Sequence, residues 1–180
     1  MKKKQKRDEF KLRLSGVGIG NHKFSMFCDK EFFELAEITE VIEGSISLDI
    51  EMEKKETMLQ LFFHFYGKVS LPCDRCLDPV SLPLDFTESL IVKFSSTGET
   101  NMEDDMIWII PENEYDLDVF HFVYESVILA FPSKIIHPET EDGKSSCNPE
   151  ILERLEKLSM KEIGNDPRWD ILKNIKTEDN

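Results

Sequence analysis

The sequence lacks any apolar run long enough to cross a membrane, and it lacks a secretory leader. A membrane-spanning helix needs about 18 or more apolar residues, whereas the longest candidate, VILAFP at residues 127–132, stops at a proline. The basic start MKKKQKRDEF is followed by alternating residues and not by the apolar core of a signal peptide. We therefore expect a soluble, cytoplasmic protein with no membrane partner.

Cysteine is scarce, with four residues in a chain of 180. Only Cys73 and Cys76 are close in sequence, as the single C-x-x-C pair within LPCDRCLDPVSLPL at residues 71–84. Few cysteines and no leader are typical of a reducing compartment, which argues against a disulfide scaffold. The pair therefore needs another explanation.

Basic residues are absent from the middle of the chain. Between Lys93 and Lys134 there are nine acids and no lysine or arginine. The net charge is −14, yet residues 1–13 carry seven basic and two acidic residues, so this start is +5 and the remainder is −19. Such a surface repels a phosphate backbone, so we expect no DNA partner and only local contact with any RNA.

Period-two alternation of apolar residues predicts most of the fold as strands. The clearest pair, at residues 46–52 and 59–71, is joined by the polar turn KKET and predicts an antiparallel hairpin. Alternation continues over 80–94, where Glu88 breaks the pattern and suggests a bulge near Thr87 or a strand end. Weaker strand patterns occupy residues 10–14, 22–28 and 106–110.

Helical spacing appears in the second half of the chain. Apolar residues from Leu117 to Phe131 recur at helical intervals, with Asp116 or Asp118 near the start and Pro132 after the end. Shorter helices are expected after Asn148 and after Asp166, and in a short segment capped by Asp29.

These patterns predict an α+β fold, with an antiparallel meander sheet of five to six strands, one main packed helix and a loosely attached helical C-terminal tail. The segment before that tail is polar and rich in proline, so little burial offsets the cost of ordering it. The expected divisions are a flexible basic arm (1–8), a core domain (9–132), a mobile linker (133–147) and the helical tail (148–180).

The C-x-x-C pair admits four interpretations. A redox pair needs the first cysteine at a helix start, but Leu77, Asp78 and Pro79 lead into a strand. Two thiols could also act as small apolar side chains in a tight turn. A zinc site needs four ligands, and His137 and Cys147 would have to complete the pair. We favour no cofactor and keep zinc at these four residues as an alternative.

The fourth interpretation is a recognition turn that presents Arg75 between the cysteines. A guanidinium can bind a phosphate or a base edge through two hydrogen bonds. Besides Arg75, the candidates for binding RNA or a partner are the two cysteines that flank it, basic residues at the start of the chain, and two residues near the C-terminus. They are Cys73, Cys76, Lys2, Lys3, Lys4, Lys6, Arg7, Arg168 and Trp169.

Three segments together resemble the YceD family, the large ribosomal RNA subunit accumulation proteins. They are CDRCLDPVSLPL, YDLDVFHFVYESVILAFP and DPRWDILKNI, and the likeness spans about residues 44–175. The family's pattern is matched at Cys73, Arg75, Cys76, Leu77 and Pro79, then at Asp116, Leu117, Leu129 and Pro132, and finally at Asp166, Pro167, Arg168 and Trp169. Many relatives carry further cysteine pairs between the second and third segments, whereas this chain has only Cys147 there.

The resemblance implies a non-enzymatic factor for accumulation of 23S ribosomal RNA and for assembly of the large subunit. The expected partner is a ribosomal RNA precursor, contacted locally because of the acidic charge. The alternatives are an acidic adaptor for a basic ribosomal protein, or a small zinc-binding module. A dinucleotide or nucleophile motif is not apparent in the sequence.

Overall fold

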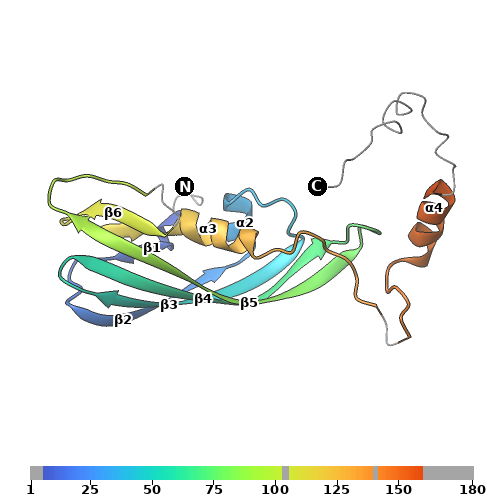
Figure 1. The fold of residues 1–180 in the computed structure, drawn as a ribbon, viewed down its shortest axis with the longest axis horizontal. Helices are drawn as coiled ribbons and strands as arrows, with labels where there is room; N and C mark the ends of the chain where they lie inside the picture. The colour runs from blue at the N-terminus through green and yellow to red at the C-terminus, as the bar shows by residue number, and fades with distance from the viewer. Residues whose placement is uncertain (1–5, 103–105, 140–141, 160–180) are drawn as a thin grey trace, which may run out of the picture.

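The computed structural model describes residues 6–102, 106–139 and 142–159. Figure 1 shows an elongated sheet with helices along one face and a last helix beyond its end. In chain order the elements are β1 (Lys11–Arg13), β2 (Gly20–Cys28), α2 (Lys30–Leu35), β3 (Glu43–Lys54), β4 (Met58–Pro72), β5 (Pro79–Ser95), β6 (Ile107–Pro111), β7 (Asp116–Asp118), α3 (Phe120–Leu129) and α4 (Pro149–Ser159). This is the predicted α+β class.

The main sheet has the strand order β2-β3-β4-β5-β6. The first four strands form the predicted antiparallel meander, and the β3–β4 hairpin closes with Lys54 opposite Leu59. The fifth strand, β6, pairs with β5 in parallel, with Ile91 opposite Ile107. The connection between the ends of β5 and β6 is therefore a crossover and not a hairpin turn. The predicted antiparallel meander sheet of five to six strands is thus confirmed, except that its β5–β6 pair at the edge is parallel.

The expected bulge near Thr87 does not occur. The β4–β5 ladder runs without interruption from Met58 opposite Lys93 to Pro72 opposite Pro79. Glu88 faces Phe63 in this ladder, yet it stays exposed because it borders an open cavity of about 320 Å³ beside the end of α3. Its position is therefore explained by an opening in the helical cover and not by a shift of the strand.

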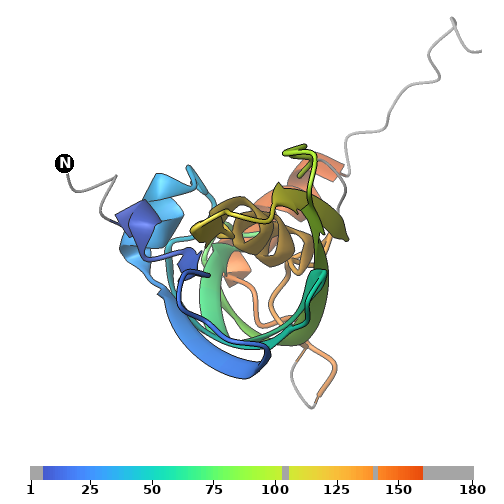
Figure 2. The same cartoon turned by 90° about the vertical axis from the view of Figure 1, so that its left-hand side faces the viewer.

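The core fills the concave side of the curved sheet. Viewed along its length, the sheet forms a trough that holds α3 (Figure 2). Phe63 and Trp108 contact Phe122 of α3 with ring centroids 4.8 Å and 6.0 Å apart. Phe10 and Phe32 extend the same core and are fully buried. The alternating apolar residues therefore face the helix, as the period of two predicts.

The predicted main helix starts later than expected. Asp116–Asp118 form strand β7, which pairs with β1 so that Leu12 lies opposite Leu117. Both leucines are buried, and Asp118 then accepts a hydrogen bond from the backbone N–H of Phe120 at 3.0 Å. An extended backbone buries Leu117 against β1 in a way that a longer helix would not, so the helix occupies only Phe120–Leu129.

A close approach of two strands occurs at Gly67 of β4. A Cβ atom at this position would lie 2.2 Å from the carbonyl oxygen of Ser45 on β3. No side chain fits at such a separation, so glycine is required at this point, where β4 passes close to the backbone of β3.

The C-terminal helix α4 begins as predicted, because the Asn148 side chain accepts a hydrogen bond from the N–H of Glu150 at 3.1 Å. None of its residues is fully buried. The helix expected after Asp166 lies outside the described residues. Among the helices of the described ranges, none combines the length and apolar character needed to cross a bilayer.

Candidate functional site

The C-x-x-C pair forms the turn between β4 and β5. The N–H of Leu77 donates to the carbonyl of Cys73 at 2.9 Å, and the N–H of Cys73 donates to the carbonyl of Asp78 at 3.0 Å. Leu77 has a φ of 64°, a left-handed conformation that is uncommon for a leucine. This tight turn brings both thiols to the inner side of the hairpin end, where Cys73 and Cys76 are 0% and 5% exposed.

Two residues from the segment after α3 join the two thiols. The Sγ atoms of Cys73, Cys76 and Cys147 and a ring nitrogen of His137 all lie within 4.8 Å of one another. Cys73 Sγ and Cys147 Sγ are 3.7 Å apart, and Cys76 Sγ and His137 Nδ1 are 3.4 Å apart. The sequence named these four residues as the alternative ligand set, and the fold brings all four together.

A short loop explains how His137 meets Cys147. Glu139 and Ser145 form an antiparallel bridge, and the N–H and hydroxyl of Ser146 both donate to the carbonyl of Pro138. These contacts close the loop so that the residues on either side of it, His137 and Cys147, reach the same point. Spacing in the sequence gives no sign of this closure.

The same segment is tied to the hairpin by Asp74. Its N–H donates to the carbonyl of Ile135 at 2.7 Å, and its carboxylate accepts the N–H of Ile135 at 2.6 Å. A small second core forms around the three cysteines and Val80, with partly buried side chains packed against it at Ile135, Ile136, Ile151 and Leu152. Residues 133–139, expected to be part of a mobile linker, thus dock on the end of the sheet.

The thiols of Cys73 and Cys147 are the more acidic ones in this cluster. Burial raises the pKa of Cys73, but hydrogen bonds from the backbone N–H groups of Cys76 and Arg75 and from His137 lower it to about 6. The hydroxyl of Ser145 lowers the pKa of Cys147. Both shifts favour thiolates, the form in which cysteine binds metal ions.

The other two groups shift in the opposite direction. Burial raises the pKa of the Cys76 thiol, although N–H groups of Asn148 and Asp78 oppose this. Hydrogen bonding to Cys73 raises the pKa of His137, as does Cys147. The cluster therefore holds thiolate and imidazole groups close together in a pocket largely shielded from water.

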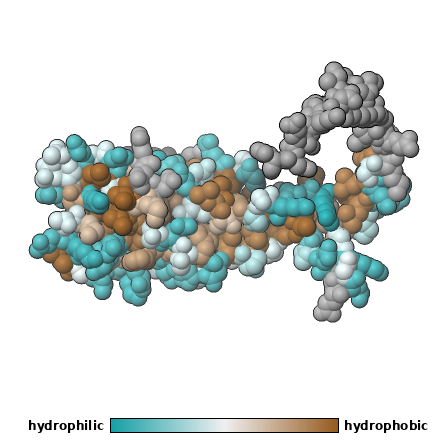
Figure 3. Space-filling view, in the orientation of Figure 1, coloured by the Kyte–Doolittle hydropathy of each residue, from teal (hydrophilic) through white to brown (hydrophobic). Residues whose placement is uncertain are grey.

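Arg75 points outward from the same turn. It is exposed, and its side chain makes no ion pair with any residue in the described part of the chain. Leu77 is 75% exposed beside it. Apolar surface is visible at this end of the molecule (Figure 3), where Leu155 and Leu158 of α4 are also exposed. The turn thus combines a free guanidinium with apolar side chains.

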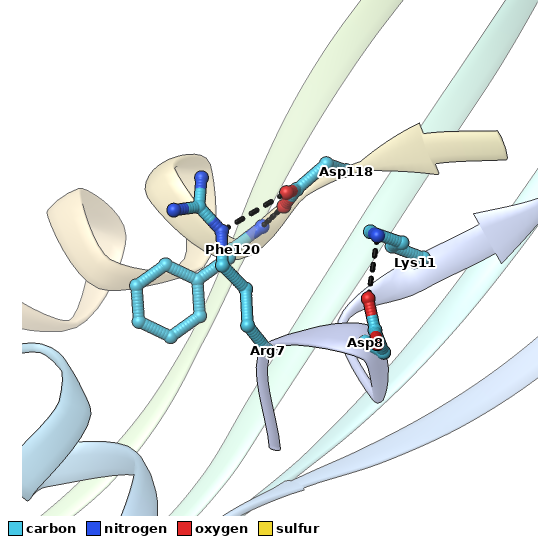
Figure 4. A network of polar contacts seen from close by, with 5 residues as sticks. All are labelled: Arg7, Asp8, Lys11, Asp118 and Phe120. Atoms are coloured by element: carbon cyan, nitrogen blue, oxygen red, sulfur yellow. Dashed lines mark hydrogen bonds and ion pairs between the residues drawn. The ribbon is translucent and has the colours of Figure 1, made fainter. Parts of the chain in front are cut away.

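Two basic residues of the start bind the protein's own carboxylates. Lys6 is 8% exposed and pairs with Glu9 and Asp29 at 3.0 and 3.1 Å. Arg7 bonds to Asp118 at 3.1 Å and lies over the ring of Phe120 (Figure 4). Residues 6–8 form a helical turn and not a free arm, and Lys6 is too buried and too well paired to reach a phosphate. The other candidates, Lys2, Lys3, Lys4, Arg168 and Trp169, lie outside the described residues.

A separate groove of about 1160 Å³ lies between α2 and strands β3 and β4. Phe33, Ile38 and Val69 form its apolar floor, and Lys30 and Glu34 lie at its rim. Its lining contains no histidine or cysteine. Among the described residues, the cluster of three cysteines and one histidine therefore lies at the hairpin end and not in this groove.

Residues 61–176 match the family described as large ribosomal RNA subunit accumulation protein YceD. The chain belongs to the YceD family. The matched region begins within β4 and includes the whole hairpin turn, α3 and the segment that carries His137 and Cys147. The family's description concerns the accumulation of large-subunit ribosomal RNA and names no reaction. No curated protein and no solved structure matches the chain.

Sequence reasoning missed some residues that support this site. The carbonyl of Pro79 lies 3.3 Å from His137 Nε2, and the Asp74 carboxylate binds the Ile135 backbone. Both are contacts between segments about 60 positions apart, and backbone atoms take part in each. The one available signal was the short polar side chain of Asp74 inside a turn, which is typical of side chains that bond to backbone.

Proposed function

We propose that the chain is a non-enzymatic factor for accumulation of 23S ribosomal RNA, and that it contacts the RNA precursor through the β4–β5 turn. Family membership supports the role, and the observation that carries the contact is the exposed, unpaired guanidinium of Arg75. A charge of −19 outside the first thirteen residues confines RNA binding to small areas, because most of the surface repels phosphate.

The turn suits a local contact for two reasons. The hydrogen bonds within the turn fix the backbone around Arg75, so little backbone freedom is lost when its side chain binds. Lys134, which is exposed, precedes the residue bonded to Asp74 and therefore adds a second cation at the same end. Two cations at one fixed end can bind adjacent phosphates without a broad basic face.

Binding of purified protein to fragments of large-subunit precursor RNA tests this contact. Arg75→Ala should weaken binding and reduce the dependence of log affinity on log salt by about 0.7 to 0.9, the value for one lost phosphate contact. Lys93→Ala is a matched control, because it removes the same charge at the other end of the β4–β5 ladder, about 45 Å away along the strand.

Crosslinking and sequencing in cells tests the role itself. The chain should crosslink to large-subunit ribosomal RNA, and Arg75→Ala should reduce those crosslinks. If Arg75→Ala and Lys93→Ala behave alike, the turn is not the contact. If the protein binds a basic ribosomal protein tightly and RNA fragments not at all, the acidic adaptor is the correct function.

One observation supports the alternative function, an acidic adaptor for a basic ribosomal protein. Glu112, Glu114 and Asp116 are all exposed in and before β7, and of these three only Asp116 has a residue of the basic start opposite it in the β1–β7 pairing, Arg13. This acidic stretch has the charge to attract a basic protein.

A further inference from the structure

We propose that Cys73, Cys76, His137 and Cys147 bind one Zn²⁺ ion, through three thiolate sulfurs and the Nδ1 atom of the imidazole. The site is built from the β4–β5 turn and from the two ends of the 138–146 loop. Metal binding at this site depends only on the geometry of these groups and is independent of any contact with RNA.

Two separations between the ligand atoms fit the edges of a zinc tetrahedron, and all four atoms lie within 4.8 Å of one another. With zinc–sulfur distances of about 2.3 Å, two sulfurs of a tetrahedron lie about 3.8 Å apart, and a sulfur and a nitrogen lie about 3.6 Å apart. Cys73 Sγ and Cys147 Sγ are 3.7 Å apart, and Cys76 Sγ and His137 Nδ1 are 3.4 Å apart. A disulfide requires about 2.05 Å, so the observed spacing matches edges of a coordination tetrahedron.

The imidazole is oriented as a metal ligand. Its Nε2 lies 3.3 Å from the carbonyl of Pro79, an acceptor for the N–H of that nitrogen. In the neutral ring, a hydrogen bond there places the proton on Nε2 and leaves Nδ1, on the side of the thiols, as the atom that can bind a metal ion. The backbone of the turn adds a second feature, because the N–H of Arg75 points at Cys73 Sγ at 3.4 Å. Such an N–H stabilises negative charge on the sulfur.

The site is closed, which indicates a structural ion. Cys73, Cys76 and Cys147 are at most 5% exposed, and the four protein ligands use all four positions of a tetrahedron. Catalytic zinc keeps one position for water or substrate, and no such position remains. Three sulfurs and one nitrogen in this arrangement select a soft or borderline ion of tetrahedral preference, which among divalent ions is zinc.

A bound ion would connect two distant parts of the chain. The hairpin turn supplies residues 73 and 76, and the segment leading to α4 supplies residues 137 and 147. The second core beneath them is small, with Val80 the only buried residue besides the cysteines. Four metal bonds would therefore contribute most of the attachment of α4, and would also fix the turn that presents Arg75.

Metal content and cobalt spectra test the site. Full-length protein purified under reducing conditions should carry one zinc per chain. When the metal is removed and Co²⁺ is added, the visible spectrum should show the intense bands of tetrahedral cobalt, with a thiolate charge-transfer band in the near ultraviolet. Cys147→Ser and His137→Ala should lower zinc content under a competing chelator from one ion per chain to none.

Cys28→Ser is the matched control, because Cys28 is buried in the main core and should leave metal content unchanged. Near-ultraviolet circular dichroism from Trp108, which lies in the main core, shows whether each variant remains folded. If the wild-type chain binds neither zinc nor Co²⁺ when reduced, the proposal is wrong. It is also wrong if Cys147→Ser gives the same cobalt spectrum as wild type, or if the folded protein is isolated with a Cys73–Cys147 disulfide and no metal.

A third readout does not depend on variants. Chelation should speed hydrogen exchange at the amides of Ile135 and of α4, and should leave exchange in β3 and β4 unchanged. Uniform exchange before and after chelation would contradict a connecting role for the ion.

Discussion

Asp74 binds Ile135 through two hydrogen bonds, one from its own N–H to the Ile135 carbonyl at 2.7 Å and one from the Ile135 N–H to its carboxylate at 2.6 Å. The two residues are 61 positions apart. This pair aligns the segment after α3 with the turn between β4 and β5, and together with the contact of His137 to the Pro79 carbonyl it holds the two segments together.

Asp74→Ala should loosen this attachment by about 1 kcal/mol, because one hydrogen bond to a charged group is lost at a partly exposed position. Hydrogen exchange at the Ile135 amide should accelerate by about five-fold, which corresponds to that free energy. Asp78→Ala is the control, since its side chain is exposed in the same turn. Equal protection of Ile135 in both variants would show that the carboxylate contributes little.

Gly67→Ala should destabilise the protein by about 2 kcal/mol or more, because the new Cβ would lie 2.2 Å from the Ser45 carbonyl oxygen and strands β3 and β4 would have to separate. Urea unfolding followed by tryptophan fluorescence, to which the buried Trp108 contributes, measures the change. Gly18→Ala is the matched control, because a Cβ there meets nothing within 4 Å. A Gly67→Ala variant as stable as Gly18→Ala would contradict the close approach.

Asp29 should make stability depend on pH in the acid range. Burial raises the pKa of its carboxyl, but the hydrogen bond from Lys6 and the N–H of Phe32 bring it below the ordinary value of 3.8. The folded state therefore holds this proton less tightly than the unfolded state. The stabilisation is present above about pH 4 and is lost as the pH falls through the lowered value.

Two variants separate the charge of Asp29 from its role as helix cap. Asp29→Asn keeps a capping oxygen for Phe32 but loses the ion pair, so it should flatten the acid dependence with a small loss of stability. Asp29→Ala should lose a further ~1 kcal/mol, typical of a missing cap. Thermal unfolding between pH 3 and pH 7 measures both. An unchanged acid dependence in Asp29→Asn would contradict the assignment.

The Cys28 thiol should not react with alkylating agents in the native protein. Its ionisation should lower the stability of the fold at high pH. Burial raises the pKa of its thiol to about 12. Because the unfolded thiol ionises near 9, stability should fall as the pH rises from about 9 towards 12. Alkylation at pH 8 should leave Cys28 unmodified in the native protein and modify it in urea. Cys28→Ala should remove this part of the alkaline dependence, and rapid native alkylation would show that the thiol is accessible.

Local patterns predicted the strands because the sheet buries one face. Ile46 and Leu48 alternate with polar residues, and the structure buries both, so the period of two was sufficient. The same reasoning failed at Leu117, whose apolar side chain fits a helical pattern equally well. Its strand is decided by pairing with Leu12, more than 100 positions earlier, and a window of local sequence does not contain that partner.

The sequence named all four residues of the site, but only the first two are identified by their spacing, for a similar reason. Cys73 and Cys76 are recognisable by their spacing, whereas His137 and Cys147 are separated from them by α3 and from each other by a loop. Their convergence depends on hydrogen bonds to backbone atoms, such as those of Asp74 and Ser146, which cannot be predicted from residue type alone. The outward direction of Arg75, by contrast, follows from the turn itself and was expected.

The pairing of β1 with β7 has a consequence for biosynthesis. The nascent chain emerges from its amino end, so Leu12 leaves the ribosome long before Leu117 exists to cover it. The hairpins β3–β4 and β4–β5 join neighbouring segments and can assemble early, while the first strand must wait until about 105 further residues have been translated. A truncated product ending before β7 would therefore leave the apolar side of β1 bare and open to association with other chains.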